Sequence, residues 1–450
     1  MELEQRIICL IAERDAAIKR TEELEKEKHV LEKENMELRR KLAFYEGPHT
    51  PPSHETLKKA VVEERNEPPK KRGAPIGHEG VTRVLPEPDA VEHVSVRICP
   101  NCKLDPGEPT GKEEITIEDT VKPPRIKVTK YVLDVHDCQH CHYKFTARHE
   151  NCPTKGRFGV NLLVYSTMLK FHMRGPLRKI EEFMLYHNDF KASPKAIMDM
   201  HLRVGDVCKI EYDNMVLRIR AARWRHIDET SFKVNGKKFW LWIFRTNEGD
   251  VLVVIRDSRG SNVVKEILGE DHEGPDIVDG WTAYNFIRIL QRCWAHLLRE
   301  VDAYKEISEN GKRLSGEVHS MFDQLKGELD KNPSMVERTH LKENHDRQIK
   351  ALVRRYDKFK ELEKPVGYIR GGFGNWYTCL LYPGMEPTNN LGEQAMREHV
   401  IMRKIIGCFR SENGSQNYQY IASLLASWKL QGKNMFVELD SLLRRELCLA

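Results

Sequence analysis

The sequence contains no long hydrophobic run. Its longest uninterrupted apolar stretches have six residues, as from Phe239 to Phe244, whereas a membrane-spanning helix needs about 20. The N-terminal residues include Glu2 and Glu4 and lack a small-residue cleavage site, so they do not resemble a signal peptide. We therefore expect a cytoplasmic protein with no membrane partner.

The chain also has little excess charge of either sign. Its 73 Lys and Arg residues against 68 Asp and Glu leave a net charge of +5, which permits a nucleic-acid partner but does not argue for one. Hydrophobic residues make up 40% of the 450 residues and charged residues 31%, which excludes a disordered or collagen-like chain. At this length we expect roughly two to four domains.

The 11 cysteines are an odd number in a long chain without a secretory leader, so we do not expect a disulfide framework. Four of them lie in two CxxC pairs, Cys99 with Cys102 and Cys138 with Cys141, separated by 35 residues. A CxxC turn presents two thiolates on one side, and tetrahedral Zn²⁺ takes four. The spacing predicts a zinc ribbon over residues 90–152 with one structural Zn²⁺; buried or redox cysteines are the alternative.

Residues 1–46 carry a seven-residue repeat of apolar side chains. The repeating positions are Leu3, Leu10, Ala17, Leu24, Leu31 and Leu38. The companion seam, four residues further on, is partly polar. The pattern predicts a short leucine-zipper-like coiled coil and hence a homo-oligomer, whereas a single charged helix packed on its own protein is the alternative.

Residues 47–89 are rich in proline, which fixes φ and removes a backbone donor, so we expect a linker. Its basic run, Lys70, Lys71 and Arg72, is a candidate contact for DNA phosphates, or an ordinary solvated charge run. Residues 153–222 have helical periodicity, and Ser193 before Pro194 marks the start of a helix that we expect to end near Leu202. Helix, turn and helix is the geometry of a DNA-binding helix-turn-helix, and a plain helical bundle, which has the same pattern, is an equal alternative.

Residues 223–304 change from a helical period to a period of two. The segments RWRHID, KKFWLWIFRT and DVLVVIRDS are predicted as three successive strands, with an Asn235-Gly236 turn after the first. Shorter elements should follow: a helix from about Asn262 capped by Ser261, a strand at PDIVD, a helix near 283–289, a strand before Cys293 and a helix from Trp294. We expect the first part of an α/β core here.

Residues 305–365 are highly charged and helical, which predicts a helical insertion over residues 305–386, and residues 387–450 should return to the core. Three acidic residues then stand out. Asp228 follows an apolar strand residue, Asp279 ends the fourth strand, and Glu393 lies on a helix that Asn389 or Asn390 would cap. Carboxylates at strand ends line the ligand edge of an open α/β sheet.

Three converging carboxylates suit a pair of Mg²⁺ or Mn²⁺ ions about 3.5–4 Å apart, which activate a nucleophile and stabilise a leaving phosphodiester oxygen. Taken singly, each acid has a turn or cap role as its alternative. Glu229 should point to the opposite side of the strand from Asp228, and Asp257 and Asp276 are weaker candidates for ligands.

Four stretches carry a family resemblance: HIDETSFKVNGKKFWLWIF, DIVDGWTAYN, QRCWAHLLREVDAY and PTNNLGEQAMREHVIMRKIIGCFRSENGSQNYQYIASLLASWKLQGKN. They closely resemble the insertion sequence 66 family of DDE transposases. The N-terminal zipper, the linker with KKRGAP and the CxxC ribbon also resemble the layout of that family. The resemblance therefore covers nearly the whole chain, and its last block is the most specific.

The resemblance implies a DNA transposase: a multidomain α+β protein with an RNase H-like catalytic core and an α-helical insertion. Its DDE triad would be Asp228, Asp279 and Glu393, holding two Mg²⁺ (or Mn²⁺) ions. The implied reaction is DNA cleavage at the ends of an insertion sequence, followed by strand transfer. The implied partners are terminal inverted repeats, target DNA, further copies of the chain and any accessory proteins that the element encodes, at a prokaryotic nucleoid.

Four basic residues after Glu393 are candidates for phosphate contacts, with ordinary helix surface as the alternative for part of them: Arg397, Arg403, Lys404 and Arg410. The chain has Gln394 where the family typically has Arg. Cys293 and His296, in CWAH, resemble a CxxH motif of several DDE transposase groups; a core cysteine and a hydrogen-bonded histidine are the alternative. The rival functions are an inactive transposase-derived DNA-binding regulator, another RNase H-like nuclease and a coiled-coil scaffold.

Overall fold

The computed structural model describes residues 2–46, 91, 101, 103–105, 125–137, 140–142 and 144–449. The chain divides into two compact units, Met1–Leu57 with Lys127–Ala450, and Lys58–Ile126. Several predicted features lie outside the described residues: the linker 47–89 with Lys70, Lys71 and Arg72, and the cysteines Cys99, Cys102 and Cys138. The zinc ribbon therefore stays a prediction. Within the described part of the chain, no helix is long and apolar enough to cross a membrane.

The N-terminal segment forms one helix, α1, over Glu2–Glu46. Three of its heptad leucines, Leu24, Leu31 and Leu38, have exposed side chains. The coiled coil stays a prediction. Further along, β1 (Val135–Asp137) pairs antiparallel with β2 (Lys144–Thr146), and Cys141 lies exposed in the turn between them.

Three helices precede the sheet: α2 (Val160–Phe171), α3 (Leu177–Asn188) and α4 (Pro194–Ala221). The Ser193 hydroxyl accepts a hydrogen bond from the Ala196 N–H at 3.2 Å, as expected of a helix cap. The prediction that this helix ends near Leu202 is wrong. The helix continues because its later turns bury Tyr212, Met215 and Ile219 in the main hydrophobic core.

A five-stranded sheet forms the centre of the structure. Its strands are β3 (Arg225–Val234), β4 (Lys237–Thr246), β5 (Val251–Arg256), β6 (Asp276–Val278) and β7 (Leu290–Arg292), in the spatial order β5-β4-β3-β6-β7. β3, β4 and β5 pair antiparallel, whereas β6 and β7 run parallel to β3. The predicted Asn235-Gly236 turn joins β3 to β4 with φ of +49° and +75°, the left-handed pair that a tight hairpin needs.

The elements between the strands agree with the sequence pattern except at one place. α5 (Ser261–Leu268) and α6 (Trp294–Asp302) lie where helices were expected, although Ser261 is the first residue of α5 and its cap is Gly260. The helix expected near 283–289 is wrong. Only a 3-10 turn, η1 (Thr282–Tyr284), forms there, because the chain has to become extended again before β7 begins at Leu290.

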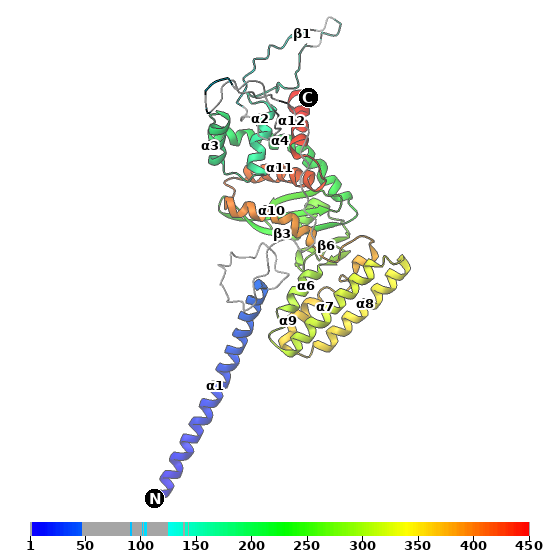
Figure 1. The fold of residues 1–450 in the computed structure, drawn as a ribbon. Helices are drawn as coiled ribbons and strands as arrows, with labels where there is room; N and C mark the ends of the chain where they lie inside the picture. The colour runs from blue at the N-terminus through cyan, green and yellow to red at the C-terminus, as the bar shows by residue number, and fades with distance from the viewer. Residues whose placement is uncertain are drawn as a thin grey trace. The chain divides into compact units, whose positions relative to one another are not determined.

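Helices cover both faces of the sheet (Figure 1). On one face, Trp242, Phe244 and Val254 pack against α4, α5 and α11 (Glu412–Leu430). On the other face, the alternate residues Leu241, Ile243 and Val253 pack against α10 (Asn390–Ile406). The chain ends with α12 (Met435–Arg444) and the turn η4 (Arg445–Leu449).

The charged segment after α6 forms a helical insertion between α6 and α10. It contains α7 (Glu309–Asp330), α8 (Met335–Tyr356), η2 (Lys360–Leu362), α9 (Glu363–Arg370) and η3 (Thr378–Leu381). Figure 1 shows α6 to α9 gathered into one group, and they share a core that includes Trp294, Tyr377 and the fully buried Trp376.

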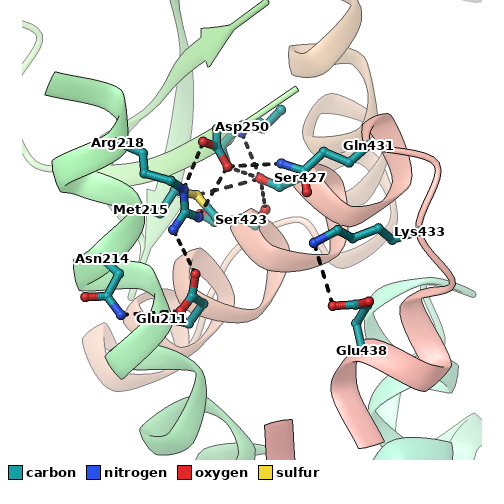
Figure 2. A network of polar contacts seen from close by, with 11 residues as sticks. Glu211, Asn214, Met215, Arg218, Asp250, Ser423, Ser427, Gln431, Lys433 and Glu438 are labelled. Atoms are coloured by element: carbon teal, nitrogen blue, oxygen red, sulfur yellow. Dashed lines mark hydrogen bonds and ion pairs between the residues drawn. The ribbon is translucent and has the colours of Figure 1, made fainter. Parts of the chain in front are cut away.

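The edge strand β5 is protected by side chains of α11. The N–H groups of Val251 and Val253 donate to the hydroxyls of Ser427 and Ser423, each at 2.8 Å. Beside them, Arg218 of α4 binds both carboxylate oxygens of Asp250, at 3.0 and 3.3 Å (Figure 2). Unpaired edge donors are a template for pairing with another chain, and here the helix satisfies them.

Candidate active site

Asp228 lies in β3, and Asp279 directly follows the neighbouring parallel strand β6. In the β3–β6 ladder, Arg225 pairs with Asp276 and His226 with Ile277. Continuing the same register to the third residue after the first pair places Asp228 beside Asp279, which directly follows the last residue of β6. The two carboxylates therefore meet where β6 ends, at the edge of the sheet where such folds bind ligands.

Glu393 reaches this edge from the first turn of α10. The fully buried Asn389 holds the start of that helix against β3. Its amide N–H donates to the Ile227 carbonyl oxygen at 2.8 Å, and its Oδ1 lies 3.1 Å from Nδ1 of His226. Burial lowers the pKa of His226 to about 4, so the ring is neutral and donates through Nδ1. Asn389 was expected only as a helix cap; its side chain makes no cap bond and joins the helix to the strand that carries Asp228.

The pKa values of all three carboxylates are raised, mainly by burial. Burial raises the pKa of Asp228 well above its ordinary value, and the negative charges of Glu229, Asp279 and Glu393 raise it further. Burial likewise raises the pKa of Asp279 and of Glu393, although nearby arginines oppose the rise. Negative charge is thus concentrated in a small, partly dehydrated space, an arrangement that favours a bound cation.

Glu229 lies on the opposite face of β3 from Asp228, as the alternation of side chains along a strand predicts. Its carboxylate accepts hydrogen bonds from Arg259, at 2.8 Å, and from the hydroxyl of Tyr284. Burial and the charge of Asp279 raise its pKa to about 7, against the opposing effects of Tyr284 and Arg259. Glu229 therefore anchors Arg259 beside the site rather than joining the three carboxylates.

A model of a protein family, described as the Transposase IS66 family, matches residues 155–417. The chain belongs to this family. The matched range includes Asp228, Asp279 and Glu393, together with the sheet and the whole helical insertion. No curated protein gives a match to the chain. Membership in the Transposase IS66 family makes the chain a transposase, a class of protein that acts on DNA.

Cys293 and His296, the CxxH pair of this transposase, have different surroundings. The Sγ atom of the buried Cys293 accepts the N–H of Asn389 at 3.1 Å, and burial raises the pKa of its thiol to about 11. The thiol thus stays protonated at neutral pH and positions the start of α10. His296 is half-buried, with Nδ1 at 3.8 Å from Glu393 Oε1.

Three arginines lie around the carboxylates and were not predicted from the sequence as site residues. Arg299 of α6 donates to Glu393 at 2.9 Å, and Arg259 and Arg292 lie close enough to lower the pKa of Asp279. Arg299 follows His296 by three residues, a helical spacing that places both on one face of α6 and is the only signal in the sequence. Nothing in the local sequence distinguishes Arg259 or Arg292 from surface residues.

The four basic residues after Glu393 have unequal exposure. Arg397, Lys404 and Arg410 are exposed, and the charge of Arg397 lowers the pKa of Glu393. Arg403 is half-buried and donates to the Thr230 hydroxyl at 3.0 Å and to the Ser231 carbonyl oxygen. Arg403 therefore joins α10 to β3, whereas the other three side chains are accessible to a ligand.

The three carboxylates supply the oxygen ligands that Mg²⁺ prefers, and a cation would relieve their mutual repulsion. Within the described ranges, however, no three His, Cys, Asp or Glu side chains stand close enough together to hold one metal ion. Glu393 is bound to Arg299 instead. The donor set thus fits Mg²⁺ in kind, whereas the positions of the side chains do not form a coordination shell.

Proposed function

We propose that this member of the Transposase IS66 family is a DDE transposase with an RNase H-like core. Asp228, Asp279 and Glu393 would hold two Mg²⁺ (or Mn²⁺) ions, and the enzyme would cut DNA at the ends of its element and join them to target DNA. The observation that carries the proposal is the β3–β6 register, which brings Asp228 beside Asp279, while Asn389 fixes the helix of Glu393 to the same strand. The mixed sheet, with its three antiparallel strands followed by two parallel ones, supports the RNase H-like assignment.

When bound, the divalent ions would activate the attacking water or 3′-hydroxyl and stabilise the leaving oxygen of the phosphodiester. The chain's own residues would position the reactants. Arg299 holds Glu393 and would compete with a cation for its carboxylate. The exposed Arg397, one helical turn after Glu393, would bind the DNA backbone next to the site, together with Lys404 and Arg410.

The experiment is strand cleavage and transfer by the full-length chain with Mg²⁺ or Mn²⁺. The labelled DNA should carry the terminal repeats that flank the coding region. Asp279→Asn keeps the shape of the side chain but removes a ligand charge, and it should lower both rates about a thousandfold or more. Asp257→Asn is the matched control, since Asp257 is an exposed acid after β5.

Equal strand transfer by the wild type and Asp279→Asn would eliminate the metal assignment. DNA binding without cleavage by the wild type would favour the inactive regulator.

The two N-terminal proposals have separate tests. The zinc ribbon predicts one Zn²⁺ per chain in native mass spectrometry, and a variant lacking residues 1–46 should fail to pair two DNA ends if the coiled coil builds the oligomer.

A further inference from the structure

Three arginines lie near Asp279, and two of them are hydrogen-bonded to other carboxylates. The charges of Arg259, Arg292 and Arg299 all lower the pKa of Asp279. Arg259 donates to Glu229 at 2.8 Å, and Arg299 donates to Glu393 at 2.9 Å. Arg292, the last residue of β7, makes no side-chain hydrogen bond or ion pair with any described residue.

Arg292 is nevertheless buried, at 6% exposure. Its Nε is among the buried side-chain nitrogen atoms that find no partner in the described part of the chain. Arg225, at 1% exposure, is a second buried arginine, and all of its guanidinium nitrogens have hydrogen-bonding partners. Its guanidinium binds Asp276 at 2.5 Å and the carbonyl oxygens of Ile219 and Ala222 at 3.1 and 3.0 Å. A buried polar group without a partner is costly, so its retention calls for an explanation.

The helical insertion fixes where Arg292 points. Its guanidinium carbon lies 5.3 Å from the ring centre of Tyr368 in α9 and 5.6 Å from that of Trp376. Its backbone N–H donates to Asn375 at 2.8 Å. Aromatic rings contact the face of a guanidinium and leave the N–H donors at its edge available. Arg292 is thus held in place, with its donors unused.

These donors lie against the backbone that follows Asp279. A Cβ atom at Gly280 would stand 2.8 Å from Nη2 of Arg292 and 2.5 Å from the Tyr368 ring. Gly280 is therefore the residue that lets the guanidinium approach the strand end. A planar cation with free edge donors beside a catalytic carboxylate matches a phosphate group.

We propose that Arg292 binds the DNA phosphodiester that reacts at this site, donating through its edge N–H groups to the non-bridging oxygens. The inference rests on the proposed function and deepens it. It also gives the insertion a role, because Tyr368 and Trp376 hold the arginine that contacts the substrate.

The test pairs Arg292→Gln with DNA in which the reacting phosphate is replaced by a neutral methylphosphonate. Cleavage of ordinary DNA by Arg292→Gln should be about 100-fold slower, the usual cost of one donor to developing charge. Arg292→Lys should recover less than a tenth of the loss, because an ammonium lacks the planar pair of donors. The control is Arg288→Gln, an exposed arginine paired with Glu273, which should cleave at the wild-type rate.

Binding in Ca²⁺ supplies a readout that does not depend on turnover. The wild type should bind the phosphate DNA about tenfold more tightly than the methylphosphonate DNA, and Arg292→Gln should bind the two almost equally. Equal preference by both proteins, or full cleavage by Arg292→Gln, would overturn the inference while leaving the transposase proposal intact. If the wild type binds selectively but never cleaves, the proposed reaction fails and the phosphate contact stands.

Discussion

At the start of β3 and β6, Arg225 and Asp276 form a buried ion pair, and the other guanidinium donors of Arg225 reach carbonyl oxygens of the preceding segment. Three residues further along, Asp228 in β3 and Asp279 just after β6 are neighbours with raised pKa values, and the side chain of Arg292 has no hydrogen-bonding partner among the described residues. Both ends bury charge. The first end satisfies its charges within the protein, whereas we propose that the second binds a cation and a phosphate group from outside.

The largest expected effect on stability tests the satisfied end. Arg225→Met would leave the Asp276 carboxylate buried with only His272 beside it, at a cost of about 3–5 kcal/mol in the free energy of unfolding. Arg292→Met should cost about 1 kcal/mol, since it loses only contacts with aromatic rings. Urea unfolding of both variants measures the difference. Similar costs would mean that Arg292 is as structural as Arg225.

The next prediction concerns how stability depends on pH, through the buried carboxyl groups near Asp228 and Asp279. The pKa of Glu229 is about 7 in the folded protein, against an ordinary value of 4.5. The folded state therefore holds more protons than the unfolded chain between these values, and the free energy of unfolding should fall by about 3 kcal/mol as the pH rises through this window. The raised pKa values of Asp228, Asp279 and Glu393 act in the same direction.

Glu229→Gln removes one of these raised carboxyl groups, so the stability of the variant should depend less on pH than that of the wild type. Urea unfolding from pH 5 to pH 8 in EDTA provides the measurement. Glu266→Gln, which removes an exposed carboxylate paired with Arg256, is the control. An unchanged slope in Glu229→Gln would show that Arg259 and Tyr284 keep this carboxylate charged.

A divalent cation should reduce the repulsion at the same end. At a hundred times its Kd, Mg²⁺ should raise the free energy of unfolding by about 2.7 kcal/mol. The gain should be larger at pH 8 than at pH 5.5, because protons compete for the same carboxylates. Thermal unfolding at constant ionic strength should show this stabilisation by Mg²⁺ for the wild type and not for Asp228→Asn. Equal stabilisation of both proteins would place the ion elsewhere.

The smallest expected effect concerns the stability of the edge strand β5, which lies away from the carboxylates. Ser427→Ala deprives the Val251 N–H of its acceptor and should cost about 1–2 kcal/mol, with DNA cleavage unchanged. Ser441→Ala, at an exposed position of α12, should cost nothing measurable. A loss of cleavage in Ser427→Ala that exceeds its loss of stability would link this edge to the reaction.

Much of this architecture could be predicted from the sequence because it depends on local pattern. The aromatic and β-branched run in KKFWLWIFRT, after an Asn-Gly turn, specifies a hairpin whichever way the rest of the chain folds. The three carboxylates became candidates by the same means, because Asp228 follows an apolar strand residue, Asp279 follows β6 and Glu393 lies in the first turn of α10. The prediction of a helix near 283–289 was wrong because a local apolar pattern carries no information that β7 begins at Leu290.

The sequence by itself determined most of the strands and the main helices, because hydrophobic period and turn chemistry act over a few neighbouring residues. It also singled out Asp228, Asp279 and Glu393 as candidate site residues. Only the tertiary structure decided how these acids are surrounded: Asn389 joins α10 to β3, and Arg299 binds Glu393 across 94 residues. It also decided that Arg292 has unused donors whereas Arg225 has none. The physical reason is that the partner of a charged group is set by long-range packing, which no short stretch of sequence encodes.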